Sequence, residues 1–442
     1  MDRTEQTSIY WNPLIETLPR EKLVQIELKR FRELLRWAKE NSPFYRRKLQ
    51  GIDPQDIKSL EDIARVPMTE KDELRAAQEG KEPFLYGELL AVPPESLSAF
   101  HQTSGTTGKP VYIPDTYESW QWLVEIWCYL LYAAGFRRSD RVFLPFNYNV
   151  YIAFWQGHYA AEKIGCEVVP GGALDTRGRI QKMKEVKATA LMNTPTYGLH
   201  MIEVSKEMGI DPKKDLNVKK MVCAGEPMPE PTRLRLEEEW GVDVYDHIGG
   251  TESGAWAGMC SEKRGMHVME PHFILEMVDL ETMSRPISPG IKGVVVLTPL
   301  CRKCVPLIRF NLKDIMMVME EPCSCGRTSL RVDQVSGRVD DLRKIRGVFF
   351  SPHVVEEVVR REFPEVVEFE TSLTQERAVP ILTVRLELDP SIAESQAKHV
   401  LSRLREQLKI RTNLTFELEM AKPGELPRYT LKSARFKDLT KK

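Results

Sequence analysis

The alternation of apolar and polar residues predicts a long amphipathic helix near the start of the chain. Between residues 22 and 50, apolar side chains recur every three or four positions among charged ones, as at Leu23, Ile26, Phe31, Leu34, Leu35 and Ala38. We expect this apolar face to pack against the body of the protein. A basic amphipathic helix can instead rest on a membrane, but the many acidic residues here favour packing.

From about residue 95 to 300, short apolar or β-branched runs alternate with longer helical stretches. The expected elements are a helix over 118–134, a strand over 141–146, a helix over 152–164 and a strand over 166–170. Such alternation is typical of βαβ units and predicts an α/β fold with a mostly parallel sheet. Two later runs, at 274–281 and 293–300, are joined by a turn-rich segment and are expected to add an antiparallel pair to that sheet.

The pattern changes after Arg338, where a smaller α+β unit is expected. Its predicted elements are a helix over 352–362, a strand over 381–388, a helix over 392–408 and a strand over 414–418. We therefore expect a domain boundary near Asp340. It separates a large N-terminal domain, residues 1–339, from a small C-terminal domain, residues 340–442.

Composition narrows the possible functions. The 442 residues are 42% hydrophobic and 29% charged, with 63 basic against 64 acidic side chains. This is enough to build a sizeable core and offers no bulk attraction to nucleic acid or to an anionic membrane, so neither is expected as a partner. No apolar run is long enough to span a bilayer and no signal-peptide pattern opens the chain, so we expect a cytoplasmic protein. The sequence leaves a homodimer open.

The densest chemical signal is the segment TSGTTGKP at residues 103–110. Glycines let a loop turn its backbone N–H groups into a concavity, while hydroxyl groups and a lysine add donors for a polyanion. The spacing of the glycines excludes a Walker A loop. On composition alone a flexible turn is an equal alternative. The predicted phosphate-binding residues are Ser104, Gly105, Thr106, Thr107, Gly108 and Lys109.

This segment resembles the phosphate-binding signature of the adenylate-forming superfamily, and the whole chain is similar to the phenylacetate-CoA ligase family. The motifs of this family occur in this chain in the same order as in the family, from FYRRKL near the start to LPRYTLKSARF near the end. The resemblance implies an adenylate-forming fold with a large N-terminal and a small mobile C-terminal domain. It also implies ATP, Mg²⁺ and coenzyme A as cosubstrates or cofactors.

Two motifs resemble the nucleotide-binding segments of the family. AGEP at 224–227 would lie against adenine, and DHIGGTE at 246–252 would end in the carboxylate that holds magnesium, Glu252. The family usually has an aromatic residue where this chain has Ile248. The residues that the resemblance assigns to the nucleotide here are Gly225, Glu226, Pro227, Asp246, His247 and Thr251. For His247, a structural role is an equal alternative.

Two further motifs lead to the proposed hinge. PLIRFNLKD at 306–314 is similar to a family segment whose last aspartate binds the ribose, which assigns that role to Asp314. Residues 311–313 depart from the usual sequence. GRVDD at 337–341 resembles the family's hinge, so Arg338 is expected near the nucleotide and Asp340 where the small domain pivots. Each segment taken alone also fits an ordinary polar surface.

The C-terminal segment PRYTLKSAR resembles the family motif that carries the catalytic lysine, with Leu431 in place of glycine. Lys432 would stabilise negative charge on the phosphoryl oxygens when a carboxylate attacks the α-phosphate. Without the resemblance, a lysine in a basic tail is simply solvated.

Cysteines and one histidine indicate a structural zinc site. Cys260, His267, Cys323 and Cys325 supply three sulfurs and one imidazole, the donor set of a closed tetrahedral centre. Several relatives of the resembled family have zinc at corresponding places. Reduced thiols beside a hydrogen-bonded histidine are the alternative, and Cys301 with Cys304 forms a rival pair.

Residues 145–155 lie where the family forms its acid-binding pocket, and they are rich in aromatic side chains, including Phe146, Tyr148 and Tyr151. Phe154 and Trp155 are expected in the core. An aromatic carboxylic acid is the first choice of substrate. We therefore predict an AMP-forming aryl-acid:CoA ligase. The alternatives are an adenylating enzyme with another acceptor or a cofactor substrate, and a non-catalytic zinc-bearing binding protein of the same fold.

Overall fold

The computed structural model describes residues 8–103, 109–283, 286–345, 348–376, 379–429 and 435–440. Its first part is helical, with α1 (Pro13–Glu16), α2 (Arg20–Asn41), α3 (Pro43–Lys48) and α4 (Lys71–Gln78). The helix predicted over 22–50 is broken at Ser42, which caps α3 by accepting from the Tyr45 N–H, while Pro43 takes the first position of α3. Leu23, Phe31 and Leu34 are buried, so the predicted packing of the apolar face is confirmed.

The centre of the large domain is an eight-stranded sheet in the order β13-β9-β8-β7-β6-β5-β3-β4. Its strands are β3 (Arg141–Leu144), β4 (Glu167–Pro170), β5 (Ala190–Asn193), β6 (Lys220–Cys223), β7 (Asp243–Gly250), β8 (Gly254–Gly258), β9 (Met266–Val268) and β13 (Arg331–Val332). Strands β4, β3, β5, β6 and β7 run parallel, as predicted, and β8, β9 and β13 extend the sheet antiparallel.

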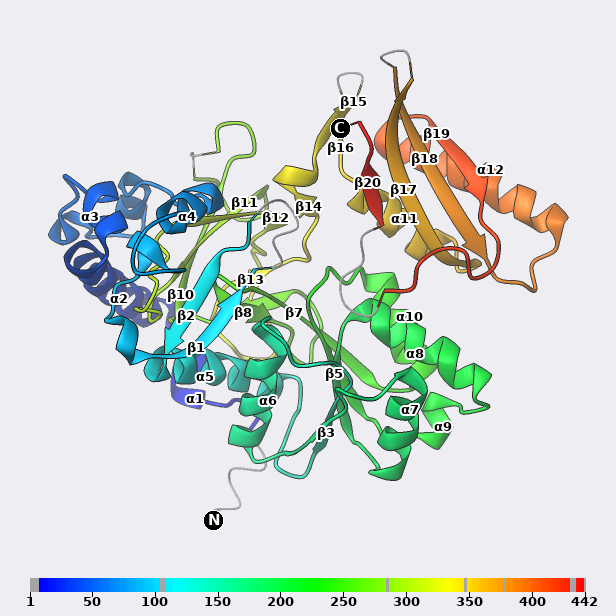
Figure 1. The fold of residues 1–442 in the computed structure, drawn as a ribbon, viewed down its shortest axis with the longest axis horizontal. Coiled ribbons are helices and arrows are strands. Elements are labelled where there is room, and N and C mark those ends of the chain that lie inside the picture. Colours follow the sequence, from blue (N-terminus) through cyan, green and yellow to red (C-terminus); the bar gives the residue numbers. More distant parts are fainter. Residues whose placement is uncertain are drawn as a thin grey trace.

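Helices cover both faces of this sheet (Figure 1). Alternate side chains of β3 divide between the two faces: Val142 and Leu144 join the core under α5 (Tyr117–Ala133) and α6 (Ala153–Ile164). Phe143 joins the opposite core, under α7 (Thr176–Glu185), α8 (Pro195–Glu207) and α10 (Glu230–Trp240). Short α9 (Pro212–Asp215) precedes β6. The βαβ units read from the sequence are confirmed.

The predicted antiparallel pair exists, but its placement in the parallel sheet is wrong. β10 (Phe273–Val278) and β11 (Lys292–Pro299) pair with each other, and β12 (Phe310–Met317) and β14 (Gly337–Arg338) complete a separate four-stranded sheet. Strand β11 pairs with β10 on one side and with β12 on the other, so it has no free edge with which to join the eight-stranded sheet. A small sheet of β1 (Leu97–Gln102) and β2 (Tyr112–Thr116) lies beside it (Figure 1).

The C-terminal part has its own hydrophobic core, drawn entirely from residues between Ile345 and Phe436. Its elements are β15 (Arg343–Ile345), β16 (Val348–Phe350), α11 (His353–Glu362), β17 (Val366–Glu376), β18 (Val379–Leu388), α12 (Glu394–Thr412), β19 (Phe416–Met420) and β20 (Phe436–Asp438). The four elements predicted here are confirmed within a few residues. Strands β15, β16, β17 and β20 were not predicted. Among the described helices, none is both long and apolar enough to cross a bilayer.

Candidate active site

Polar segments gather at the carboxyl ends of β5, β6 and β7, where parallel α/β sheets usually bind ligands. The loop after β6 contains Gly225, whose φ of +89° favours glycine. In the same loop, the Glu226 carboxylate accepts a hydrogen bond of 2.7 Å from the Thr196 N–H, in the first turn of α8. The start of α8 and the AGEP segment are thereby joined.

Asp246 and His247 lie on β7 and are buried. Burial raises the pKa of Asp246 well above its ordinary value and lowers the pKa of His247 to about 4. The His247 ring packs on Trp127 with centroids 4.4 Å apart, and its Nδ1 lies 2.9 Å from the Cys223 carbonyl oxygen. His247 therefore has a full structural role in the core, and its contact with a nucleotide stays a prediction.

Glu252, the predicted magnesium ligand, is held from two sides. Its carboxylate lies 2.8 Å from the Lys71 Nζ at the start of α4, and its side chain is 11% exposed. The carbonyl oxygens of Thr251 and Glu252 accept hydrogen bonds of 2.8 and 2.7 Å from Arg302. Arg302 is itself fully buried in a two-point ion pair with Asp115, so a rigid buried pair positions this segment.

Ser104, Gly105, Thr106, Thr107 and Gly108 of the predicted phosphate loop lie outside the described residues. The base of the loop is braced because Thr103 N–H donates to the Val111 carbonyl and Val111 N–H donates to the Thr103 hydroxyl, at 3.0 and 2.9 Å. Lys109 is exposed and forms an ion pair with Glu79.

Helix α4 connects three of the predicted segments. Arg75 donates to the Lys109 carbonyl over 3.1 Å, Lys71 pairs with Glu252, and Glu70 accepts from the Asn311 amide over 2.9 Å. The end of the predicted phosphate loop, the predicted magnesium ligand and the segment before Asp314 thus meet at one helix. No motif in the sequence had singled out α4.

Asp314 and Arg338 face each other across β12 and β14, and their side chains form an ion pair of 2.5 Å. Lys313 pairs with Asp340 over 3.0 Å. The predicted ribose ligand and the predicted hinge are therefore neighbours. Gln334, just before β14, donates over 2.8 Å to the carbonyl of Met228, next to the AGEP segment, which ties this corner to the nucleotide motifs.

Lys432 lies outside the described residues, but both flanks of its loop are described. Arg428 contacts Glu203 on α8 at 3.3 Å, and Arg435 lies 3.4 Å from the Thr196 hydroxyl. Thr196 is the residue whose N–H binds Glu226. The two flanks thus place the ends of the lysine loop against the helix that borders the AGEP segment.

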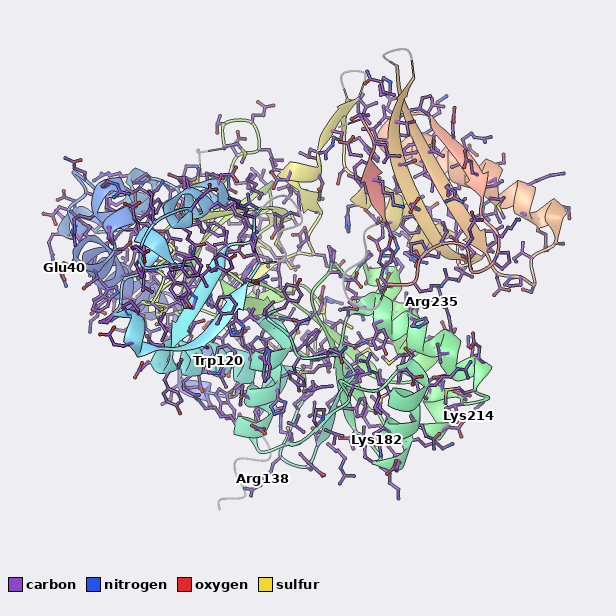
Figure 2. The ribbon with its side chains drawn as sticks, in the orientation of Figure 1. Glu40, Trp120, Arg138, Lys182, Lys214 and Arg235 are labelled. Atoms are coloured by element: carbon purple, nitrogen blue, oxygen red, sulfur yellow. The ribbon has the colours of Figure 1, made fainter. Side chains whose placement is uncertain are left out.

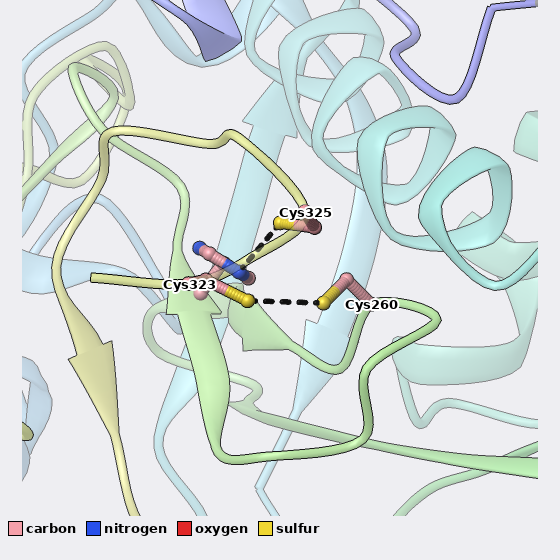
Figure 3. A group of neighbouring side chains, drawn as sticks. Cys260, Cys323 and Cys325 are labelled. Carbon is pink, nitrogen blue, oxygen red and sulfur yellow. Dashed lines mark hydrogen bonds between the residues drawn. The ribbon is translucent and has the colours of Figure 1, made fainter. Parts of the chain in front are cut away.

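Cys260, His267, Cys323 and Cys325 form a buried cluster whose donor atoms all lie within 4.8 Å of one another (Figure 3). The Cys260 and Cys323 sulfurs are 3.7 Å apart, and the Cys325 sulfur lies 3.3 Å from the His267 Nε2. Cys260 comes from the β8–β9 connection, His267 from β9, and Cys323 and Cys325 from the loop before β13. Three sulfurs and one imidazole at these distances fit a tetrahedral zinc ion.

Neighbouring groups orient this cluster. His267 Nδ1 lies 3.2 Å from the Ser329 hydroxyl, which leaves Nε2 turned toward the sulfurs. A hydrogen bond from Cys260 lowers the pKa of the Cys325 thiol, so this sulfur favours the thiolate form that binds metals. Cys301 and Cys304 are not part of any metal-binding group found among the described residues, which favours the first set over the rival pair.

The predicted acid pocket is lined with packed aromatic rings. Phe146 is buried and stacks on Phe154, while the Tyr148 hydroxyl lies 2.6 Å from His158 Nδ1 and its ring packs on Trp155. Phe154 and Trp155 pack against the main core, as expected. Tyr151 is 40% exposed.

Comparison with known proteins decides the family. Residues 44–296 match the family described as AMP-binding enzyme, and residues 347–440 match the AMP-binding enzyme C-terminal domain. The chain belongs to the AMP-binding enzyme family. It is 32% identical to the phenylacetate-coenzyme A ligase of Thermus thermophilus, over 95% of this chain and 96% of that protein. The predicted membership of the phenylacetate-CoA ligase group is confirmed.

Solved structures agree with this assignment. A crystal structure of 2-hydroxyisobutyryl-CoA ligase in the postadenylation state superposes with a TM-score of 0.91 at 26% identity, over 98% of this chain and 93% of the other. The same ligase in the thioesterification state, with 2-HIB-AMP and CoA, gives 0.74 at 27% identity over 100% and 94%. The chain is thus an enzyme with the adenylate-forming fold, and the AMP-forming acid:CoA ligase reaction predicted from its motifs is confirmed.

Several residues of this site were missed by sequence analysis. They are Lys71, Asp115, Thr196, Glu203 and Arg302. Arg302 lies between Cys301 and Cys304, and its partner Asp115 comes 187 residues earlier. Only the fold brings such distant charges together. A buried arginine gives no signal in a sequence that has 63 basic residues.

Proposed function

We propose that this ligase activates an aromatic carboxylic acid. The observation that carries the proposal is the full-length similarity to proteins named phenylacetate-coenzyme A ligase, 32% identical over 95% of the chain. In the first half-reaction an oxygen of the acid's carboxylate attacks the α-phosphorus of ATP, forming the acyl-adenylate and releasing pyrophosphate. In the second, the CoA thiolate attacks the acyl carbon, forming the thioester and releasing AMP.

We assign the nucleotide to the edge formed by β5, β6 and β7. Residues 104–109 hold the phosphates, Glu226 and the AGEP segment border the adenine, and Asp314 accepts the ribose hydroxyls. Glu252 is a ligand of Mg²⁺, whose chemistry is to bind phosphate oxygens and offset their charge. The Lys71–Glu252 pair of 2.8 Å supports this, since it marks Glu252 as a carboxylate that a nearby cation stabilises.

Lys432 stabilises the charge that develops on the phosphoryl oxygens during the first half-reaction. We assign the two domains to residues 1–339 and 340–442 and the pivot between them to Asp340. The separate core from residue 345 onward supports this division. The higher TM-score to the postadenylation state than to the thioesterification state of one relative supports a domain arrangement that belongs to the adenylation half-reaction.

The cysteine cluster is assigned to a structural Zn²⁺. Four protein donors within 4.8 Å close the coordination sphere, which leaves no position for a substrate. The ion would join the β8–β9 connection to the loop before β13.

A short hydroxy acid is a second candidate substrate. The rings of Phe146, Phe154, Tyr148 and Trp155 occupy space near the predicted pocket, and a structural relative of TM-score 0.91 is named 2-hydroxyisobutyryl-CoA ligase. Pyrophosphate exchange into ATP, measured over phenylacetate, benzoates and short branched hydroxy acids, distinguishes the two. Exchange driven best by an aryl acid supports the proposal, and exchange driven only by hydroxy acids overturns it.

The acceptor is tested separately. The purified enzyme is incubated with the best acid, Mg-ATP and CoA, and the thioester is measured by mass spectrometry. An acyl-adenylate that accumulates without a thioester would instead support the alternative of a different acceptor.

A further inference from the structure

The loop that contains Lys432 is held at both ends by an arginine anchored in the C-terminal domain. At one end, Arg428 binds the buried Glu387 carboxylate through both terminal nitrogens, at 3.1 and 2.6 Å. At the other, Arg435 binds the buried Glu368 carboxylate at 2.7 and 3.1 Å. Each arginine is therefore fixed in its own domain before it makes any contact with the other domain.

Both arginines also reach the same helix of the large domain. Arg428 contacts Glu203 at 3.3 Å, and Arg435 lies 3.4 Å from the Thr196 hydroxyl. Thr196 and Glu203 are seven residues apart on α8, which is two turns of a helix, so they lie on one face about 10 Å apart. Two anchored arginines that contact two groups on one helix face define both the position and the rotation of the C-terminal domain relative to α8.

The space between these contacts is a pocket formed by both domains. Thr196, Leu199, His200, Glu203 and Arg235 line it from the large domain, and Arg360, Val367, Glu368, Arg428, Tyr429 and Arg435 from the small one. In Figure 2, Arg235 lies on α10 where the two domains approach each other. Burial alone would raise the pKa of Glu203, but the His200 ring, 3.7 Å from the carboxylate, and the charge of Arg428 lower it below its ordinary value, so this carboxylate is charged at neutral pH.

We propose that Glu203, with Thr196, positions the C-terminal domain for adenylation by receiving Arg428 and Arg435 on one face of α8. Thr196 N–H also binds Glu226, so the helix that receives the lysine loop is the one that fixes the AGEP segment. The contacts break when the domain rotates for thioester formation. Glu203 is a positioning residue, and the inference rests on the proposed roles of Lys432 and of the rotating domain.

The test separates the two half-reactions. The Glu203→Ala variant is assayed for acid-dependent pyrophosphate exchange, with phenylacetate or the best acid of the screen, and for thioester formation from the supplied acyl-adenylate and CoA. We expect exchange to fall about two- to fivefold, the range for a partly exposed ion pair. Thioester formation should be unchanged or faster, because the variant has lost a contact that stabilises the adenylation arrangement of the two domains.

The matched control is Glu207→Ala. Glu207 lies on the same helix and carries the same charge, but its partner is Arg177 of the large domain, at 2.5 Å. This variant should alter neither step. Glu203→Gln, which keeps the size and polarity of the side chain, should behave like Glu203→Ala, and thermal melting establishes that both variants fold.

A double-mutant cycle with Arg428→Ala completes the test. If the two residues act as a pair, the double variant loses no more exchange than the Arg428→Ala variant alone. Equal losses in both half-reactions, or exchange by Glu203→Ala at the wild-type rate, would overturn the inference. Wild-type enzyme that shows no exchange with any acid would instead overturn the proposed function, so the two failures are distinguishable.

Discussion

At the scale of single residues, charges held by distant partners dominate the candidate site. Glu252 is paired with Lys71 and its backbone is held by Arg302, which is buried against Asp115. A buried ion pair contributes little net stability, but loss of one partner is expensive because the other charge stays buried. The pair therefore serves to hold the Thr251–Glu252 carbonyls in one position.

The magnesium assignment predicts a specific defect in Glu252→Gln. The neutral amide removes a charge that a hard cation prefers, so the magnesium concentration that gives half-maximal pyrophosphate exchange should rise at least about tenfold. A magnesium titration of both proteins measures it. The control is Glu281→Gln, an exposed carboxylate in the turn after β10. An unchanged magnesium requirement in Glu252→Gln would reject the role.

The buried carboxylate of Glu27 should make the free energy of unfolding depend on pH. Glu27 on α2 lies beside Glu270, and burial followed by the charge of Glu270 raises the pKa of Glu27 to about 9. This pKa is higher in the folded than in the unfolded chain. The contribution of Glu27 to the free energy of unfolding is therefore complete below about pH 4.5 and is lost as pH rises toward 9.

Glu27→Gln should remove this dependence. The variant should gain stability relative to wild type as pH rises from 5 to 9, by an amount on the order of a few kcal/mol. Urea unfolding at pH 5, 7 and 9 measures the difference. Glu33→Gln, an exposed position on the same helix, serves as the control. A stability difference that does not change with pH would contradict the prediction.

At the scale of elements, the cysteine cluster connects the β8–β9 connection and β9 to the loop before β13, next to the place where His267 pairs with Arg331. Tyr10 and Glu16, near the start of the chain, also reach this region: the Tyr10 hydroxyl donates to the Cys325 carbonyl at 2.7 Å, and Glu16 accepts from Arg327 at 2.6 Å. The N-terminal segment therefore packs on the loop that supplies two of the sulfurs.

The zinc assignment predicts about one equivalent of zinc in the purified protein and its loss in Cys323→Ser. The melting temperature should fall by about 5 °C or more, because bound metal stabilises only the folded chain. Metal analysis and thermal melting measure the two effects. Cys304→Ser, a buried cysteine outside the cluster, should keep its zinc. Zinc absent from both wild type and variants would end the proposal.

At the scale of the whole molecule, the N-terminal and C-terminal parts of the chain bring their predicted site motifs close together. The large domain gathers the nucleotide motifs at one sheet edge, and the C-terminal domain presents the ends of the lysine loop to α8 beside that edge (Figure 1). An enzyme that carries out two reactions in turn at one site must be able to move a group that serves only one of them.

Lys432→Ala should therefore affect only one step. We expect adenylation to fall about 100- to 1000-fold, because an ammonium that stabilises the transition state is lost. Thioester formation from supplied acyl-adenylate should be retained. Lys409→Ala, on exposed α12, is the matched control in the same domain. Equal loss of both steps would contradict the assigned role.

The sequence by itself determined the local elements and the chemical identity of the motifs. The periodicity of residues 118–134 and 352–362 identified α5 and α11, because a helix face repeats within a few residues. The motifs identified the family, because the chemistry of glycines, hydroxyls and carboxylates at a fixed spacing can be recognised from the sequence of one short segment. The break at Ser42 and the four unpredicted strands of the C-terminal part, β15, β16, β17 and β20, lie at the limit of such local signals.

Only the tertiary structure decided which charges meet. The ion pairs of Glu252 with Lys71, of Arg302 with Asp115 and of Arg428 with Glu203 each join residues far apart in the chain. The same is true of the separate sheet around β11 and of the choice between the predicted cysteine and histidine set and the rival pair Cys301 and Cys304. The physical reason is that hydrophobic periodicity and turn chemistry act over a few residues, whereas an ion pair or a metal site depends on the path of the whole chain.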